Sequence, residues 1–191
     1  MFVGRACSLI FAIAALALMV ILLFFPFFES KWKTADADPS GGISPIMKGE
    51  ITFWEFREWP LVGGQPGEEV KHTLRTEYFT CDDGKMRIQA VEGVAIIASA
   101  LCFLNFLMSV FLFCFPTILR LPLTLYFLLA ALASAVVLIL MMWWYVSPWC
   151  PEQGALKADT LYKWEYGLGW KLVIASCGSS LIGCIMAAIS C

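Results

Sequence analysis

The sequence predicts an all-α membrane protein, a bundle of four transmembrane helices with a small β-sheet in its first extramembrane loop. Three observations predict this class. Of the 191 residues, 60% are hydrophobic and only 15% are charged, a balance that is not typical of a soluble chain of this length. Four long apolar stretches interrupt the polar sequence. Between the first two lies a segment in which large apolar and polar residues alternate, as they do in half-buried strands.

The four apolar stretches are each long enough to cross a bilayer. The hydrocarbon core is roughly 30 Å thick, so a helical span needs about 20 apolar residues. None of the four contains a charged residue, and a charge near the bilayer centre would cost at least about 2.5 kcal/mol. We therefore expect one four-span membrane domain over residues 1–191, with spans at 6–28, 93–115, 121–146 and 172–191.

The first stretch has a second interpretation as a secretory leader that is removed. Arg5 precedes the apolar run, and Ala35–Ala37 imitates a small-residue cleavage site. Cleavage would leave three spans. We favour a retained span, because a leader has an apolar core of only about 7–15 residues and is cut close to its end.

Four spans place loops 29–92 and 147–171 together on the side opposite the termini. The first loop carries eight Lys and Arg residues between positions 29 and 87, whereas the terminal side has only Arg5 and Arg120. The positive-inside rule would put the loops in the cytoplasm, but loops of about 60 residues carry little weight in that rule. Charge alone leaves the orientation open. Each loop holds one cysteine, Cys81 and Cys150, which would be able to pair if the loops face an oxidising exterior.

The first loop contains two strand candidates separated by glycines. Residues 50–59 include β-branched and aromatic side chains in partial alternation with polar ones, which indicates a strand. A turn is expected at 63–67, and a second strand in 70–80. Together they predict a small antiparallel sheet.

Residues suited to catalysis or metal binding are few. His72 is the only histidine, which removes most triad and metal-site arrangements. The acidic pairs at 68–69 and 82–83 lack the alternating ligand spacing of a calcium-binding loop. The sequence has neither a glycine-rich phosphate loop nor a basic stripe for nucleic acid. We therefore expect no enzymatic activity, no cofactor, no metal and no nucleic-acid partner.

Glu92 lies at the mouth of the second span. An ionisable residue there is a candidate for a cation path, and it could also stabilise a helix N-terminus through the macrodipole. We favour the structural role.

Small residues recur along the last span at a spacing that brings them to one helix face. They are Ser176, Ser180, Gly183 and Cys184. Small side chains let transmembrane helices approach closely. We expect these residues to pack against other helices of the same bundle, which is surrounded by the lipid bilayer. A homo-oligomer, or a complex with other membrane proteins, through the third and fourth spans is the less favoured alternative.

The four-span arrangement resembles the claudin-like membrane proteins, and one motif narrows the resemblance. Ile51, Thr52, Phe53 and Trp54, followed by Arg57, resemble the first-loop signature of the amastins, a family of surface proteins of kinetoplastid parasites. The segments 87–97 and 166–170 resemble the family's entries to the second and fourth spans. The signature's glycine is replaced by Glu55, and its two flanking cysteines by Glu50 and Pro60, so the family's local disulfide does not form here.

This resemblance implies a plasma-membrane protein with cytoplasmic termini and an extracellular first loop. It also implies a non-enzymatic function, in which the folded loop contacts other membrane proteins or the host environment. Trp54 is expected to pack within the small loop sheet. A cation channel or transport component, or an accessory subunit of a larger membrane complex, are the alternatives.

Overall fold

The computed structural model describes residues 2–30, 48–62, 65–151, 155–158 and 163–189. Four helices in this part of the chain are long and apolar enough to cross a membrane. They are α1 (Phe2–Leu22), α2 (Asp82–Phe111), α3 (Pro116–Val146) and α4 (Leu168–Ile189). Together with a small antiparallel sheet, they confirm the predicted fold class. The cleavage-like segment Ala35–Ala37 lies outside the described residues.

The helices start and end at residues that suit helix termini, and these differ from the expected span limits. α1 ends at Leu22, four residues before Pro26, which has no backbone N–H to continue a helix. α2 begins at Asp82 rather than near Gly93, with Asp82 and Asp83 in its first turn, where negative charge is favoured. α3 begins at Pro116, because proline is well suited to a first helical position.

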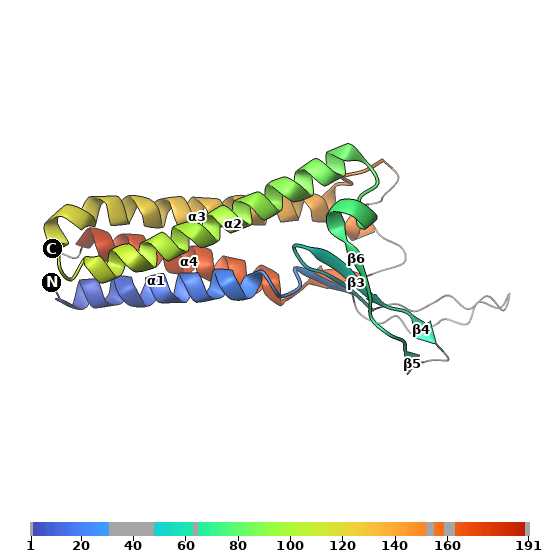
Figure 1. Ribbon diagram of the computed structural model, residues 1–191, viewed down its shortest axis with the longest axis horizontal. Helices are drawn as coiled ribbons and strands as arrows, with labels where there is room; N and C mark the ends of the chain where they lie inside the picture. Colours follow the sequence, from blue (N-terminus) through green and yellow to red (C-terminus); the bar gives the residue numbers. More distant parts are fainter. Residues whose placement is uncertain (1, 31–47, 63–64, 152–154, 159–162, 190–191) are drawn as a thin grey trace. The chain divides into compact units, whose positions relative to one another are not determined.

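The chain divides into two compact units. The helical unit comprises residues 1–24, 91–140 and 171–191. Here the helices run side by side, and both termini lie at the same end as the α2–α3 connection (Figure 1). Its core includes Leu123 and Phe127, which are fully buried. Outward-facing residues such as Ile118, which is 75% exposed, are large and apolar, as expected where the surrounding solvent is lipid.

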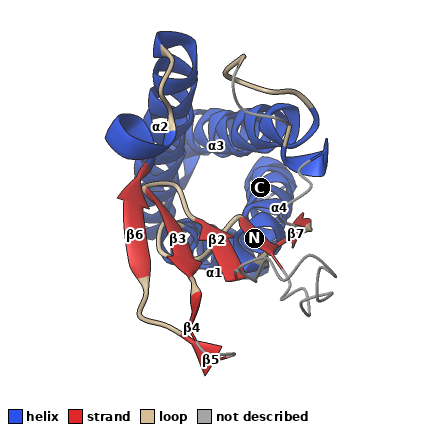
Figure 2. Cartoon of the chain, turned by 90° about the vertical axis from the view of Figure 1, so that its right-hand side faces the viewer, coloured by secondary structure: helices blue, strands red, loops and turns tan. Residues whose placement is uncertain are grey.

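The loop unit comprises residues 25–90 and 141–170. It contains a five-stranded sheet in the order β6-β3-β2-β1-β7, in which every pair is antiparallel (Figure 2). The strands are β1 (Phe28–Ser30), β2 (Lys48–Ile51), β3 (Glu55–Trp59), β6 (Val70–Thr73) and β7 (Trp164–Tyr166). A separate hairpin joins β4 (Leu61–Val62) to β5 (Gln65–Pro66). Two short helical turns complete the unit, η1 (Leu74–Tyr78) and η2 (Leu156–Ala158).

The expected strand at 50–59 is wrong, because the structure has a hairpin there. β2 ends at Ile51 and β3 begins at Glu55, and the chain reverses over Thr52–Trp54. The second expected strand is also shorter than predicted, since η1 follows β6 at Leu74. Conversely, the structure contains a strand that the sequence did not predict: β7, which comes from the second loop and pairs with β1.

Aromatic side chains form the core of the loop unit. Phe28 lies edge-on to Trp144, with ring centroids 6.0 Å apart, and Trp144 stacks on Trp149 at 5.1 Å. Phe27 packs edge-on against Phe53 at 4.9 Å. Edge-to-face and offset pairs of this kind each contribute about 0.5–1.5 kcal/mol beyond the area they bury. Contacts between aromatic rings therefore contribute much of the stability of the loop unit.

Candidate functional site

The turn between β2 and β3 is organised by the side chain of Thr52. Its hydroxyl donates a hydrogen bond to the carbonyl oxygen of Glu55 at 3.0 Å and accepts bonds from the backbone N–H groups of Glu55 at 3.0 Å and Trp54 at 3.3 Å. The backbone N–H of Thr52 also donates to the Glu55 carbonyl at 3.0 Å. A buried group that both donates and accepts at this point must be a hydroxyl. The turn thus explains why the loop motif has Thr or Ser at the position of Thr52.

The other motif residues divide between the core and the surface of the sheet. Ile51 and Phe53 are fully buried, and Phe53 packs on Phe27. Trp54 is half-buried. Phe53, rather than Trp54, is therefore the motif's fully buried aromatic.

We expect Thr52→Val to lower the free energy of unfolding of the loop unit by about 2 kcal/mol, because it leaves two backbone N–H groups without their acceptor in a buried turn. Thr52→Ser keeps the hydroxyl and should cost much less. Thermal unfolding of the reconstituted chain, followed by tryptophan fluorescence, measures both. Equal midpoints for the Val and Ser variants would show that the hydroxyl does not hold the turn.

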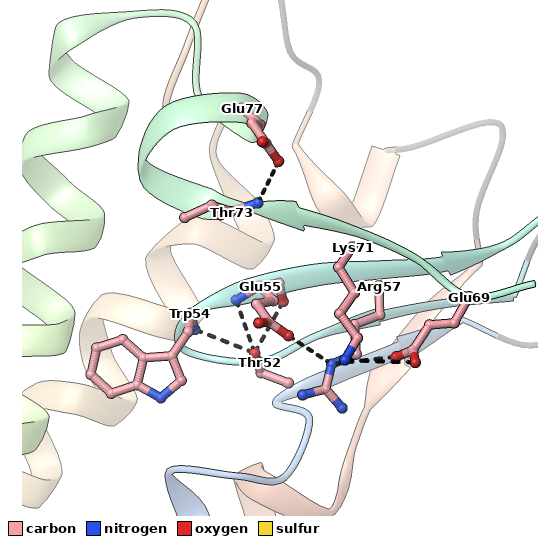
Figure 3. A network of polar contacts seen from close by, with 8 residues as sticks. All are labelled: Thr52, Trp54, Glu55, Arg57, Glu69, Lys71, Thr73 and Glu77. Atoms are coloured by element: carbon pink, nitrogen blue, oxygen red, sulfur yellow. Dashed lines mark hydrogen bonds and ion pairs between the residues drawn. The ribbon is translucent and has the colours of Figure 1, made fainter.

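Arg57 is at the centre of a charged row across one face of the sheet. Its Nε lies 3.1 Å from a carboxylate oxygen of Glu55 and 3.7 Å from one of Glu69, and Glu69 in turn lies 3.8 Å from Lys71 Nζ (Figure 3). Strand register places Arg57 opposite Glu50 on β2 and Lys71 on β6. Arg57 therefore faces one opposite charge, Glu50, and one like charge, Lys71. The Glu69 carboxylate lies close to both cations and offsets their repulsion.

The same face continues beyond Arg57 toward β2. Lys48 Nζ lies 2.8 Å from Glu50 and 4.8 Å from the centre of the Trp59 ring. These groups are one-fifth to one-third exposed, so each pair contributes little to stability. Their combined effect is a fixed pattern of charge on a sheet surface.

His72 lies on the opposite face of the sheet, between two carboxylates. Its Nε2 is 3.2 Å from Glu58 and its Nδ1 is 3.8 Å from Glu77, while the ring stacks near Phe56 at 6.1 Å. Glu77 also accepts a hydrogen bond from the backbone N–H of Thr73 at 2.8 Å. The described residues contain no group of three or more metal-binding side chains.

Cys81 and Cys150 are brought together in a disulfide with Cα atoms 5.7 Å apart and a sequence separation of 69 residues. The bond joins the chain just before α2 to the second loop, beside Phe79 and Trp149 in the aromatic core. Gly84 packs against it, since an added Cβ would lie 2.7 Å from the Cys150 sulfur. The two loops are thus linked covalently as well as through the sheet.

Glu92 is 1% exposed and lies well inside α2. It is too far from Asp82, where α2 begins, to stabilise the helix N-terminus through the macrodipole, which acts only over the first turn. Asp82 and Asp83 occupy that turn instead.

The small residues of α4 contact other helices of the same chain. The Ser176 hydroxyl donates to the Ala15 carbonyl on α1 at 3.1 Å, and the Cys184 thiol contacts the Thr124 carbonyl on α3 at 3.6 Å. Ser180 is fully buried. Gly183 faces Phe127, where an added Cβ would lie 2.4 Å from the ring. An oligomer through α3 and α4 would therefore use their outward-facing residues.

Two glycines in the segment 166–170 allow its backbone to pass close to the backbone of Pro26 and Phe27. The sequence did not predict this contact. Gly167 donates to the Phe27 carbonyl and Gly169 to the Pro26 carbonyl, both at 2.8 Å. A Cβ at either glycine would lie within 2.8 Å of the Pro26 oxygen. Glycine is therefore required at both positions, because a larger residue would clash with the backbone that leads into β1.

Tyr166 lies at the start of this crossing, in β7. Burial raises the pKa of its hydroxyl above the usual value, and Tyr145 adds to the shift. The hydroxyl donates a hydrogen bond to the Met142 sulfur at 3.3 Å.

These features define a class, a multi-pass membrane protein with four membrane-length helices and a folded, sheet-containing loop region. The family model described as Amastin surface glycoprotein matches residues 40–186. Because this match covers more than half of the chain, the protein belongs to the amastin family, as the loop motif predicted. No curated protein is significantly similar to the chain.

The family description includes the word glycoprotein, yet this sequence has no acceptor for N-linked glycans. Asn105 is its only asparagine and is followed by Phe106 and Leu107, whereas the acceptor needs Ser or Thr two positions later. Asn105 is fully buried in the helical unit and donates to the Tyr126 carbonyl at 3.3 Å. Its role is to join α2 to α3.

Proposed function

We propose that this amastin is a non-enzymatic protein of the plasma membrane, with cytoplasmic termini, whose folded outer loop contacts other membrane proteins or molecules of the host environment. The observation that carries the proposal is the charged row on the sheet, centred on Arg57 and flanked by Glu50 and Lys71. A fixed pattern of acidic and basic side chains suits recognition, because electrostatic complementarity contributes to specificity more than to affinity.

The ion pairs favour recognition over a purely structural function. Arg57 and Glu69 remain about one-third exposed, and Lys71 is 52% exposed. Pairs this open to solvent add little to folding stability, yet they hold their side chains ready for a partner. The loop segment 29–87 has eleven acidic and eight basic residues and no strong net charge to steer ligands over long distances.

The disulfide supports the outward orientation of the loops. Disulfides form and persist in oxidising environments outside the cell and are rare in the cytosol. A bond between Cys81 and Cys150 is therefore better suited to extracellular loops, and it agrees with the orientation implied by the family.

Orientation is tested by labelling intact cells with a membrane-impermeant maleimide before and after mild reduction. We expect labelling to appear only after reduction, and to be absent from a Cys81→Ser/Cys150→Ser double variant. The double variant controls for the free cysteines elsewhere in the chain. If intact cells show no such difference, while permeabilised cells do, the loops face the cytoplasm and the proposed function fails.

Contact through the sheet is tested with a photo-crosslinking residue at position 71 in cells that express the full chain. Position 86 is the matched control, because Met86 is 68% exposed but lies on α2 rather than on the sheet. We expect specific adducts at 71 that are absent at 86 and are reduced by Arg57→Glu. The same adducts at both positions, unaffected by Arg57→Glu, would contradict recognition by the charged row.

A further inference from the structure

The five-stranded sheet of the loop unit ends at β6, and its outer edge is open to solvent. Of the described strands, β3 alone pairs with β6 in this sheet (Figure 2). Lys71 and Thr73 are exposed, and Val70 is 38% exposed. An edge strand presents backbone N–H and carbonyl groups that can pair with another chain. The β6 edge is therefore a candidate for strand addition.

The register of β6 shows which of its backbone groups point outward. Antiparallel strands alternate hydrogen-bonded with non-hydrogen-bonded residue pairs. The N–H of Leu74 donates to the Trp54 carbonyl at 3.0 Å, so every second residue from Leu74 is turned toward β3. Lys71 and Thr73 are turned away, and the Thr73 N–H accordingly donates to the Glu77 carboxylate at 2.8 Å. Within the part of the chain that the structure describes, the N–H and carbonyl of Lys71 have no partner on this outer side.

The opposite edge of the sheet is covered in part. β7 is the last strand there, and the carbonyl of Trp164 accepts a hydrogen bond from the Tyr145 hydroxyl at 3.4 Å. Strand addition is therefore better suited to β6.

The charges along the β6 edge change sign at Val70. Glu68 and Glu69 precede it, and Lys71 and His72 follow it. Two such strands that run antiparallel with their Val70 residues opposite each other bring Glu69 of each beside Lys71 of the other. Opposite charges directly across two strands favour pairing, whereas like charges oppose it. Centring the pairing on Glu69 or Lys71 instead would place like charges opposite each other, so the edge is complementary to itself in one register.

We propose that two copies of this chain associate through their β6 edges, in an antiparallel pairing centred on Val70. A twofold axis relates the copies, so each contact occurs twice. Backbone hydrogen bonds form between Lys71 of one copy and Glu69 of the other, because residues two positions apart in a strand point the same way. The two sheets become continuous, and the charged rows of both copies lie on one face. This contact uses a sheet edge and holds whichever side of the membrane the loops face, so it goes beyond the proposed function.

The first test is oxidative cross-linking of a Val70→Cys variant of the full chain in vesicles. The two introduced thiols lie in a non-hydrogen-bonded pair, where Cα atoms are about 4.5 Å apart, and this spacing is within the range of a disulfide. We expect most of the variant to migrate as a disulfide-linked dimer on a non-reducing gel. The substitution is at a partly exposed position, so the fold is expected to tolerate it.

Thr73→Cys is the matched control, because Thr73 is exposed on the same strand. In the proposed register its thiols are roughly 20 Å apart along the strands, at about 3.3 Å per residue. This variant should cross-link no more than the unmodified chain, which accounts for the native free cysteines. Equal cross-linking at positions 70 and 73, or none at 70 above the unmodified chain, would overturn the proposal.

The second test exchanges the charges on either side of Val70. Adding Glu69→Lys to the Val70→Cys variant should return the dimer fraction to the level of the unmodified chain, since like charges then meet between the copies. Adding Lys71→Glu as well restores opposite charges and should recover the cross-link, and this substitution faces Arg57 within the chain. A charge-exchanged variant that stays monomeric would overturn the proposed register. Cross-linking at 70 in a chain whose loops prove to be cytoplasmic would support the pairing and remove the proposed function alone.

Discussion

Removal of the Cys81–Cys150 disulfide is expected to lower the free energy of unfolding of the loop unit by about 4 kcal/mol. This value follows from the chain-entropy model for a closed loop of roughly 70 residues, given the separation of 69 positions. The bond also lies beside the stacked rings of Phe79 and Trp149, so its loss should loosen the aromatic core.

The measurement is thermal unfolding of the Cys81→Ser/Cys150→Ser double variant in vesicles, followed by the fluorescence of the tryptophans in the loop unit. Cys114→Ser is the matched control, because Cys114 is exposed and unpaired, and it should unfold like the unmodified chain. If the double variant unfolded at the same temperature as this control, the bond would not contribute to stability, and the aromatic core alone would hold the unit.

Gly183→Ala is expected to destabilise the helical unit by about 1–3 kcal/mol through overpacking. Its new Cβ would lie 2.4 Å from Cε1 and 2.7 Å from Cζ of Phe127, and the Phe127 side chain is fully buried. Gly178→Ala is the control on the same helix, since a Cβ there meets nothing within 4 Å. That substitution should be neutral or slightly stabilising, because alanine is the better helix former.

The comparison is made by resistance of each reconstituted variant to denaturant. A second substitution, Phe127→Leu, shortens the opposing side chain and should recover part of the loss in Gly183→Ala. If Gly183→Ala and Gly178→Ala behaved alike, α3 and α4 would not be in the close contact that the structure shows.

The fold class could be predicted because it depends on local properties of the sequence. A run of about 20 apolar residues indicates a span wherever it occurs, so the four helices were found without knowledge of their neighbours. The motif at Ile51–Trp54 led to the correct family for a similar reason, since its residues are adjacent in the chain. The start of α2 was missed because hydropathy marks where a helix enters lipid, not where it begins.

Features that depend on distant residues were missed or predicted only in part. β7 pairs with β1 across more than 130 positions, and nothing in Trp164–Tyr166 alone indicates a partner. The turn after Ile51 was read as continuous strand, because the hydroxyl of Thr52 stops β2 through hydrogen bonds that alternation does not reveal. Arg57 was known as a motif residue, but its pairing with Glu69 required the fold.

The β4–β5 hairpin offers a practical way to follow this protein in living cells. Leu61 and Val62 pair with Pro66 and Gln65, and neither strand belongs to the five-stranded ladder. Connections made of small residues, such as the glycine pair at 63–64 in the sequence, are among the sites that best accept inserted sequence. An epitope tag placed between Val62 and Gln65 would leave the Thr52 turn, the charged row and the disulfide in place, so that antibody access to the tag on intact cells would report on the proposed outward orientation of the loop.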